Sequence, residues 1–262
     1  MSIRLGLDGR HALVTGAAIG VGRATARWLG RAGCAVTVVD VDEEALAGAV
    51  AEIAADGTRV HPITADLRDP DVVRGVVAAA EAAQGPLGVA VNNVGSLGGR
   101  VPTRFLDADD EWLRGIVELN LLVTMYCCQA EARAMVATGT PGVIVNVSSG
   151  ESTRPSVRMA PYGAAKAGIN SLTATLAVEL GGHGIRVVAV APGTTLTPVV
   201  AAALDDATVE SLVAAHPLGR LTEPDDLART IVAVASDLGG AITGSLVLGD
   251  NGAHLARNRP AL

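Results

Sequence analysis

Short apolar runs rich in β-branched residues alternate along this chain with longer stretches of helical period. The expected strands are 11–15, 35–40, 59–64, 89–92, 143–147, 185–191 and 245–248, and the expected helices are 20–32, 42–55, 70–84, 109–137, 161–180, 206–214 and 223–236. Strands that read as continuous Val/Ile/Ala runs are buried on both faces, and strands that alternate with helices pair in parallel. The pattern predicts an α/β fold with one doubly wound parallel sheet, helices on both faces, and a ligand crevice at the carboxyl ends of the strands.

The chain reads as a single domain that covers residues 1–262. Hydrophobic residues make up 49% of the sequence, enough for one large core, and no linker, repeat or low-complexity tract interrupts the pattern. Residues 1–9 and 253–262 are expected to be peripheral. We therefore expect the catalytic site and the cofactor site within the same domain.

Composition excludes several classes of function. Charged residues are 18% and aromatic residues 2% of the chain, and the formal net charge is −7, so neither nucleic acid nor an anionic membrane is an expected partner. Cys34, Cys127 and Cys128 fit neither a disulfide framework nor a metal site, and we expect the last two to pack inside a helix. The first residues lack the apolar core of a signal peptide, and no apolar run is long enough to span a bilayer. A soluble, cytoplasmic protein without a bound metal is expected.

A glycine-rich segment joins the first expected strand to the first expected helix. It reads Thr15-Gly16-Ala17-Ala18-Ile19-Gly20-Val21-Gly22. Glycines permit a tight turn and let the backbone approach a pyrophosphate, and the helix N-terminus offers free N–H groups to the phosphates. Glycine clusters also simply terminate strands, but the position between a strand and a helix favours a dinucleotide site.

Asp40 ends the second expected strand, where the adenosine ribose of such a cofactor would lie. A carboxylate at this position accepts hydrogen bonds from both ribose hydroxyls and repels a 2′-phosphate. No arginine or lysine occurs between Thr15 and Gly22 or at Val41 to bind that phosphate. The sequence therefore predicts NAD rather than NADP.

Lys166 is the only lysine among 20 lysine and arginine residues, and it follows Tyr162, one of 2 tyrosines, by one helical turn. A tyrosine that exchanges protons near neutral pH must lower its pKa from about 10, and a neighbouring ammonium favours the phenolate. Arginine is bulkier and cannot relay a proton in the same way. Ser149, shortly before Tyr162, can hold a substrate oxygen while Tyr162 transfers the proton, although alone it also fits ordinary strand-end polarity.

These features, taken in order, resemble the short-chain dehydrogenase/reductase family from about Arg10 to Gly252. Further segments that carry the resemblance are Asp66-Leu67, Asn92-Asn93-Val94-Gly95, Pro192-Gly193 through Thr197, Gly219-Arg220 through Pro224, and Ile242-Thr243-Gly244. The resemblance implies a Rossmann-type fold and a catalytic tetrad of Asn120, Ser149, Tyr162 and Lys166. The implied cofactor contacts are Gly16, Ala18, Ile19, Gly20, Gly22, Asp40, Asp66, Leu67, Asn93, Gly95, Tyr162, Lys166, Pro192, Gly193, Thr195 and Thr197.

The same resemblance implies further roles and an assembly. Asn120 would anchor a water that connects Lys166 to solvent, although alone it also fits a helix residue that bonds locally. A homotetramer, or at least a dimer, would form through helices 109–137 and 161–180. Two positions depart from the family, because Asn251 stands where glycine is usual and Thr195 where an aliphatic residue is usual.

Several functions fit these residues. The first is NAD-linked conversion between a secondary alcohol and a ketone. A 3-oxoacyl-carrier-protein reductase would use NADPH, which Asp40 disfavours, and a non-catalytic dinucleotide sensor would tend to lose Tyr162 or Lys166. A dihydrodiol dehydrogenase acting on a cyclic diene-diol carboxylate is a further alternative. Arg154 and Arg158 read either as solvated loop charges or as carboxylate-binding groups, and Glu151 and His216 are other candidates for the rim of the site.

Overall fold

The computed structural model describes residues 4–197, 200–201 and 204–256. Across these residues, parallel strands form one seven-stranded sheet in the order β3-β2-β1-β4-β5-β6-β7. The strands are β1 (His11–Thr15), β2 (Ala35–Asp40), β3 (Val60–Thr64), β4 (Leu87–Asn92), β5 (Gly142–Val147), β6 (Ile185–Pro192) and β7 (Leu246–Gly249). The predicted doubly wound, Rossmann-type α/β fold is confirmed.

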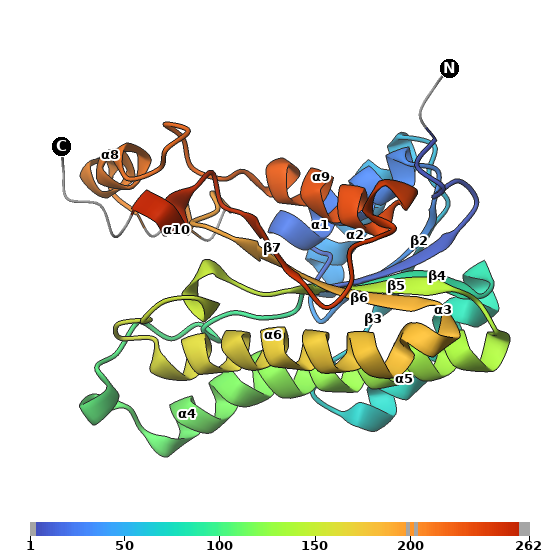
Figure 1. Cartoon of the computed structure of the whole chain (residues 1–262), viewed down its shortest axis with the longest axis horizontal. Helices are drawn as coiled ribbons and strands as arrows, with labels where there is room; N and C mark the ends of the chain where they lie inside the picture. Colours follow the sequence, from blue (N-terminus) through green and yellow to red (C-terminus); the bar gives the residue numbers. More distant parts are fainter. Residues whose placement is uncertain (1–3, 198–199, 202–203, 257–262) are drawn as a thin grey trace.

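Helices cover both faces of the sheet (Figure 1). They are α1 (Gly20–Arg31), α2 (Glu43–Ala55), α3 (Pro70–Gln84), α4 (Asp110–Val117), α5 (Val123–Thr138), α6 (Ala160–Leu180), α8 (Asp206–Ala214), α9 (Pro224–Ala235) and α10 (Ala253–Ala256). α1, α2 and α9 pack on one face, and α3, α5 and α6 pack on the other. Successive residues of β1 serve the two cores, with Val14 on the α1 side and Leu13 on the α5 side. This burial on both faces explains the continuous apolar strands.

The long helix expected over 109–137 is not continuous. α4 and α5 are separated by a π-helical turn, Glu118–Leu122. Within it, Asn120 Nδ2 donates to Ile116 O at 2.9 Å, and Thr124 Oγ1 donates to Asn120 O at 2.8 Å. Side-chain bonds of this kind compete with the regular backbone ladder and favour such a turn. The fourth strand also begins earlier than expected, at Leu87.

A buried polar network links β4, β5 and α5 beneath the sheet. Asn92 Nδ2 donates to Glu131 Oε2 at 2.9 Å and to Asn146 Oδ1 at 3.1 Å, and Asn146 Nδ2 donates to Thr173 Oγ1 at 3.0 Å. Burial raises the pKa of Glu131 to about 7, because the charged carboxylate is poorly solvated there. Cys127 and Cys128 are buried beside this network, as expected of packing residues.

The carboxyl ends of the parallel strands meet at one end of the sheet, where α8 and α10 project beyond it (Figure 1). The segments after β1, β4, β5 and β6 therefore converge there. In the described part of the chain, no helix is long and apolar enough to cross a membrane. Nor do the described residues bring together a cluster of His, Cys, Asp or Glu that could hold a metal ion.

Candidate active site

Tyr162 and Lys166 lie one turn apart on α6, as their spacing predicts. Lys166 Nζ lies 5.7 Å from the centroid of the Tyr162 ring and donates to Val147 O, at the end of β5, at 2.9 Å. The lysine side chain is buried, and this loss of hydration lowers its pKa to about 8. Near neutral pH, Lys166 can therefore both hold and release a proton.

The pKa of Tyr162 is raised, mainly because its phenol is buried. The hydrogen bond with Ser149 acts in the opposite direction, and the nearby carboxylate of Glu151 adds to the rise. The predicted lowering of this pKa by Lys166 is therefore wrong in the structure, because burial of the phenol is the largest cause and it raises the pKa. Tyr162 is held as a neutral phenol, the form that donates a proton.

Ser149, two residues after the end of β5, contacts Tyr162. It is hydrogen-bonded to the tyrosine, and its Oγ also accepts from the amide of Glu151 at 3.1 Å. Ser148 instead donates to Asn170 Oδ1 at 2.7 Å and is buried. Of these two adjacent serines, Ser149 is the one bonded to Tyr162, while Ser148 ties the end of β5 to α6.

Asn120 approaches Lys166 across the bare α-carbon of Gly95. Asn120 Nδ2 donates to Ser96 O at 2.9 Å, while its Oδ1 is buried without a hydrogen-bond partner. A Cβ on Gly95 would lie 2.6 Å from Asn120 Oδ1 and 2.8 Å from Lys166 Nζ, so any side chain at Gly95 would displace both groups. An unpaired acceptor beside an ammonium is a site that an ordered water can satisfy.

The glycine segment after β1 is held by the segment that follows β4. The Asn93 side chain donates from Nδ2 to Gly16 O at 3.0 Å, and its backbone N–H donates to Thr15 Oγ1 at 3.1 Å. A Cβ on Gly22 would lie 2.0 Å from Gly16 O, so α1 can pack this closely on the turn only with glycine. The predicted contacts Gly16, Gly22 and Asn93 are thus parts of one structure.

The start of α1 fits a bound dinucleotide. Its N-cap, Ile19, makes no side-chain cap, and the first turn contains no acidic residue. The free N–H groups and the helix dipole are therefore available to an anion such as a pyrophosphate. A Cβ on Gly20 would lie 3.2 Å from Thr197 Cγ2, which places the segment after β6 against this helix start.

Asp40 clamps the end of β2 to the glycine segment. Its Oδ2 accepts from the Ala18 amide at 2.9 Å, and its Oδ1 accepts from the Val41 amide at 2.8 Å. Asp40 therefore lies where the sequence places it, directly beside the turn.

Asp66 lies just after β3 and forms an ion pair with Arg68, which lowers the pKa of the aspartate. The neighbouring Leu67 is buried.

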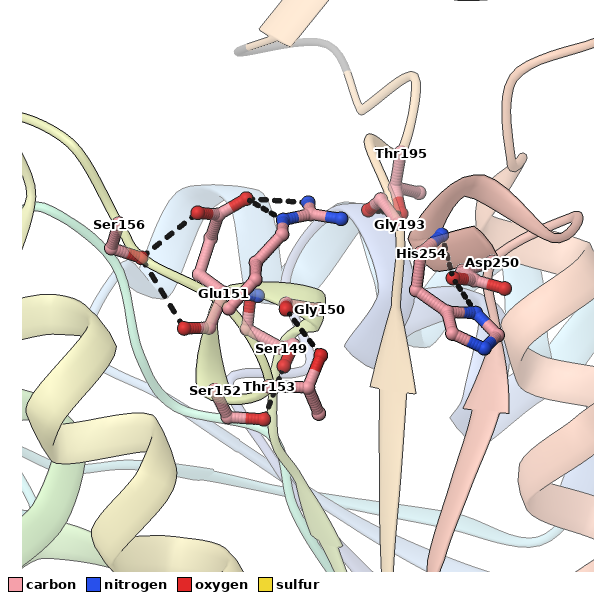
Figure 2. A network of polar contacts seen from close by, with 11 residues as sticks. Ser149, Gly150, Glu151, Ser152, Thr153, Ser156, Gly193, Thr195, Asp250 and His254 are labelled. Atoms are coloured by element: carbon pink, nitrogen blue, oxygen red, sulfur yellow. Dashed lines mark hydrogen bonds and ion pairs between the residues drawn. The ribbon is translucent and has the colours of Figure 1, made fainter. Parts of the chain in front are cut away.

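Pro192 is the last residue of β6, and Gly193, Thr195 and Thr197 follow it. Thr195 Oγ1 donates to Gly193 O at 3.2 Å. The backbone of Thr195 also forms an isolated parallel β-bridge with Thr222. Figure 2 shows Gly193 and Thr195 between the Ser149 segment and the pair Asp250 and His254. The His254 ring nitrogen Nδ1 lies 2.9 Å from Asp250 Oδ2, a pairing that the sequence alone did not indicate.

Asn251 adopts a left-handed backbone conformation, with φ of 54°. This explains why glycine is usual at the position and why asparagine can replace it, since asparagine tolerates that region better than most residues. The departure from the family pattern leaves the backbone turn after β7 intact.

The residues predicted at the rim of the site differ in burial and in their contacts. Glu151 and Arg154 form an ion pair with both side chains only 14% exposed, and Ser156 Oγ donates to Glu151 Oε2 at 2.8 Å. Arg158 is exposed, with a φ of 66°. His216 is buried, with its Nδ1 at 2.5 Å from Leu212 O and its Nε2 without a partner. Sequence reasoning could not distinguish the two arginines, because both lie in the same loop.

Comparisons with known proteins agree with this geometry. A family model described as enoyl-(acyl carrier protein) reductase matches residues 16–254. The cis-4-hydroxycyclohexanecarboxylate dehydrogenase of Sinomonas cyclohexanicum is 39% identical over 244 residues, which cover 93% of this chain and 96% of that protein. A short-chain type dehydrogenase/reductase from Mycobacterium marinum has a TM-score of 0.88 and 32% identity, covering 95% of this chain and 97% of that one. A 7α-hydroxysteroid dehydrogenase complexed with NADH and 7-oxo glycochenodeoxycholic acid has a TM-score of 0.89 and 28% identity, covering 95% and 96%.

Proposed function

This chain belongs to the short-chain dehydrogenase/reductase family, and we propose that it interconverts a secondary alcohol and a ketone with NAD(H), using Tyr162 as general acid/base. It is an oxidoreductase that acts on CH–OH groups with a nicotinamide dinucleotide. One observation carries the proposal. Four side chains from three segments form a row: Ser149 is bonded to Tyr162, Tyr162 lies beside Lys166 on α6, and Lys166 faces Asn120 across Gly95.

The proton chemistry follows from Ser149 and Tyr162. Ser149 holds the substrate oxygen, and Tyr162 exchanges a proton with that same oxygen. Because the pKa of Tyr162 is raised, the neutral phenol is ready to protonate a carbonyl oxygen, whereas alcohol oxidation requires the phenolate and should accelerate as the pH rises. A nicotinamide dinucleotide, when bound, supplies the redox chemistry as hydride acceptor or donor.

Lys166 and Asn120 complete the proton path in this proposal. The pKa of Lys166, about 8, lets the amine take up or release a proton under the same conditions. The unpaired Oδ1 of Asn120 offers an anchor for a water beside that amine. After ketone reduction Tyr162 can then regain its proton from solvent through Lys166, and after alcohol oxidation it can release the proton by the same path.

Asp40 supports NAD as the cofactor. Its carboxylate is fixed against the glycine segment through the Ala18 amide, next to where the pyrophosphate would bind. A ribose hydroxyl can donate to such a carboxylate, while a 2′-phosphate would be repelled by it. The same feature disfavours a carrier-protein reductase that uses NADPH, and the complete tetrad disfavours a non-catalytic sensor.

A homotetramer with the catalytic and cofactor sites in one domain of each subunit completes the proposal. Apolar residues are exposed on the two helices that would form the interface, with Val178 of α6 84% exposed and Val136 of α5 40% exposed. Exposed apolar side chains on adjoining helices favour association. Light scattering at micromolar concentration measures the assembly, and a monomeric mass would refute it.

The proposal is tested with a panel of secondary alcohols, by following NADH absorbance in the wild type and in Tyr162→Phe. The variant removes only the hydroxyl that exchanges the proton, so we expect NADH binding and fold to persist while kcat falls by about 10²-fold or more. NADH binding is measured separately by fluorescence titration. Near-normal kcat in the variant would refute the role of Tyr162, and a wild type inactive toward every alcohol and ketone would refute the function itself.

A further inference from the structure

Arg154 is a buried cation in the segment between Ser149 and Tyr162. Its Nε and Nη2 donate to Glu151 Oε1 at 3.2 and 2.6 Å, while Nη1 is buried without a hydrogen-bond partner. The side chain is only 14% exposed. A buried donor on a charged group destabilises a protein unless something pairs with it.

Glu151 fixes the orientation of this guanidinium. The carboxylate uses Oε1 for Arg154 and accepts from Ser156 Oγ with Oε2 at 2.8 Å, and the Glu151 amide donates to Ser149 Oγ at 3.1 Å (Figure 2). The residue that orients Arg154 is thus bonded directly to the serine that holds the reacting oxygen. A rigid connection of this kind sets the distance between the two groups.

The guanidinium lies beside Gly150, in the turn that follows β5. A Cβ on Gly150 would lie 3.5 Å from Arg154 Nη2 and 3.2 Å from Pro192 O. Gly150 directly follows Ser149, so the cation borders both the segment that carries this serine and Pro192 at the end of β6. Glu151 is also close enough to Tyr162 to affect its pKa.

We propose that Arg154 binds a carboxylate of the substrate, which is therefore a compact hydroxy acid or the corresponding keto acid. The inference rests on the proposed function and adds the class of substrate to it. One edge of the guanidinium, Nε with Nη2, is occupied by Glu151. The other edge, Nη1 with the second hydrogen of Nη2, presents two parallel donors, which match the two oxygens of a carboxylate.

The local charges fit this assignment. Glu151 neutralises Arg154 in the free protein, and a buried ion pair contributes little net stability compared with apolar packing. The formal net charge of the chain is −7, so its overall field does not attract an anion. What Arg154 offers a carboxylate is therefore directional hydrogen bonding from the guanidinium edge that Glu151 does not occupy.

Arg158 provides a matched control within the same loop. Its side chain is exposed, and its carbonyl accepts from the Thr103 amide at 2.8 Å. Arg158 belongs to neither the buried ion pair nor the contacts around Ser149. Replacing it removes the same charge from the same loop without touching the guanidinium that we assign to substrate.

The test compares hydroxy acids with their methyl esters. The probes are 3-hydroxybutyrate and cis- and trans-4-hydroxycyclohexanecarboxylate, each paired with its ester, and kcat/KM is measured with NAD for wild type, Arg154→Gln and Arg158→Gln. We expect wild type to prefer at least one acid over its ester by about 10²-fold, since two charge-assisted hydrogen bonds are lost in the ester. Arg154→Gln should remove that preference, so that acid and ester react with similar kcat/KM, whereas Arg158→Gln should retain it.

Each other outcome has a defined meaning. A wild type that oxidises esters or uncharged alcohols as well as every acid overturns the assignment of Arg154 without affecting the proposed function. Equal losses on acid and ester in Arg154→Gln also overturn it, as they indicate a structural role. If Arg154→Gln fails to fold, Arg154→Lys keeps the charge but not the fork, and an unchanged acid preference there refutes paired recognition. Inactivity toward all alcohols refutes the proposed function instead.

Discussion

Asp40 Oδ2 accepts a hydrogen bond from the Ala18 amide at 2.9 Å, which ties the end of β2 to the turn that precedes α1. The carboxylate that is proposed to select the cofactor is thus held by the segment proposed to bind its pyrophosphate. Because the bond fixes the carboxylate beside the turn, we expect a change at Asp40 to alter the proposed cofactor preference directly. It also removes an acceptor from the turn, which the variants must take into account.

The cofactor prediction follows from this contact. Wild type should favour NAD over NADP by about 10²-fold or more in kcat/KM, since a hydrogen bond to a ribose hydroxyl is replaced by repulsion of a phosphate. Asp40→Ser combined with Val41→Arg should narrow or reverse the preference. Asp40→Asn is the control, because it keeps an acceptor for Ala18 while removing the charge, and it should narrow the preference less. A wild type that prefers NADP would contradict the assigned role of Asp40.

Lys166→Arg should inactivate the enzyme although the charge is kept. Lys166 Nζ lies in a buried space bounded by Val147 O and the bare α-carbon of Gly95, which leaves no room for a guanidinium. Arginine also cannot release a proton near neutral pH, whereas the pKa of Lys166 is about 8. We expect kcat to fall by about 10²-fold or more. Lys166→Met tests the effect of side-chain size separately, because it should retain the melting temperature better than Lys166→Arg. Wild-type turnover in Lys166→Arg would refute the requirement for a lysine at this position.

Glu131→Gln should be more stable than wild type at alkaline pH. Folding raises the pKa of Glu131 from 4.5 to about 7, so its protonated form stabilises the fold fully below pH 4.5, and this contribution is lost as the pH rises through 7. Above pH 7 the variant should gain on the order of 3 kcal/mol in the free energy of unfolding, because glutamine remains neutral. Urea unfolding at pH 5.5 and pH 8.5 measures the change. A stability difference that does not vary with pH would show that Glu131 keeps its ordinary pKa in the fold.

The sequence predicted those parts of the site that depend on neighbours along the chain. Tyr162 and Lys166 are one helical turn apart. Because Lys166 is the only lysine in the sequence, its place beside Tyr162 indicates a role in proton transfer. The glycine segment between β1 and α1 is likewise readable, because a strand, a turn and a helix N-terminus follow one another directly. Asp40 could be placed because it ends a strand whose apolar run is plain, and all of these positions depend on covalent spacing and helical geometry.

The tertiary structure decided what depends on burial and on contacts between distant segments. It separated Arg154, which is buried against Glu151, from Arg158, which is exposed, although both occupy one loop. It placed Asn120 in a π-helical turn facing Lys166, and it raised the pKa of Tyr162 where the sequence predicted a lowered one. Hydration of a charge is set by everything packed around it, including segments far away in the chain, so spacing alone could not provide the sign of that shift.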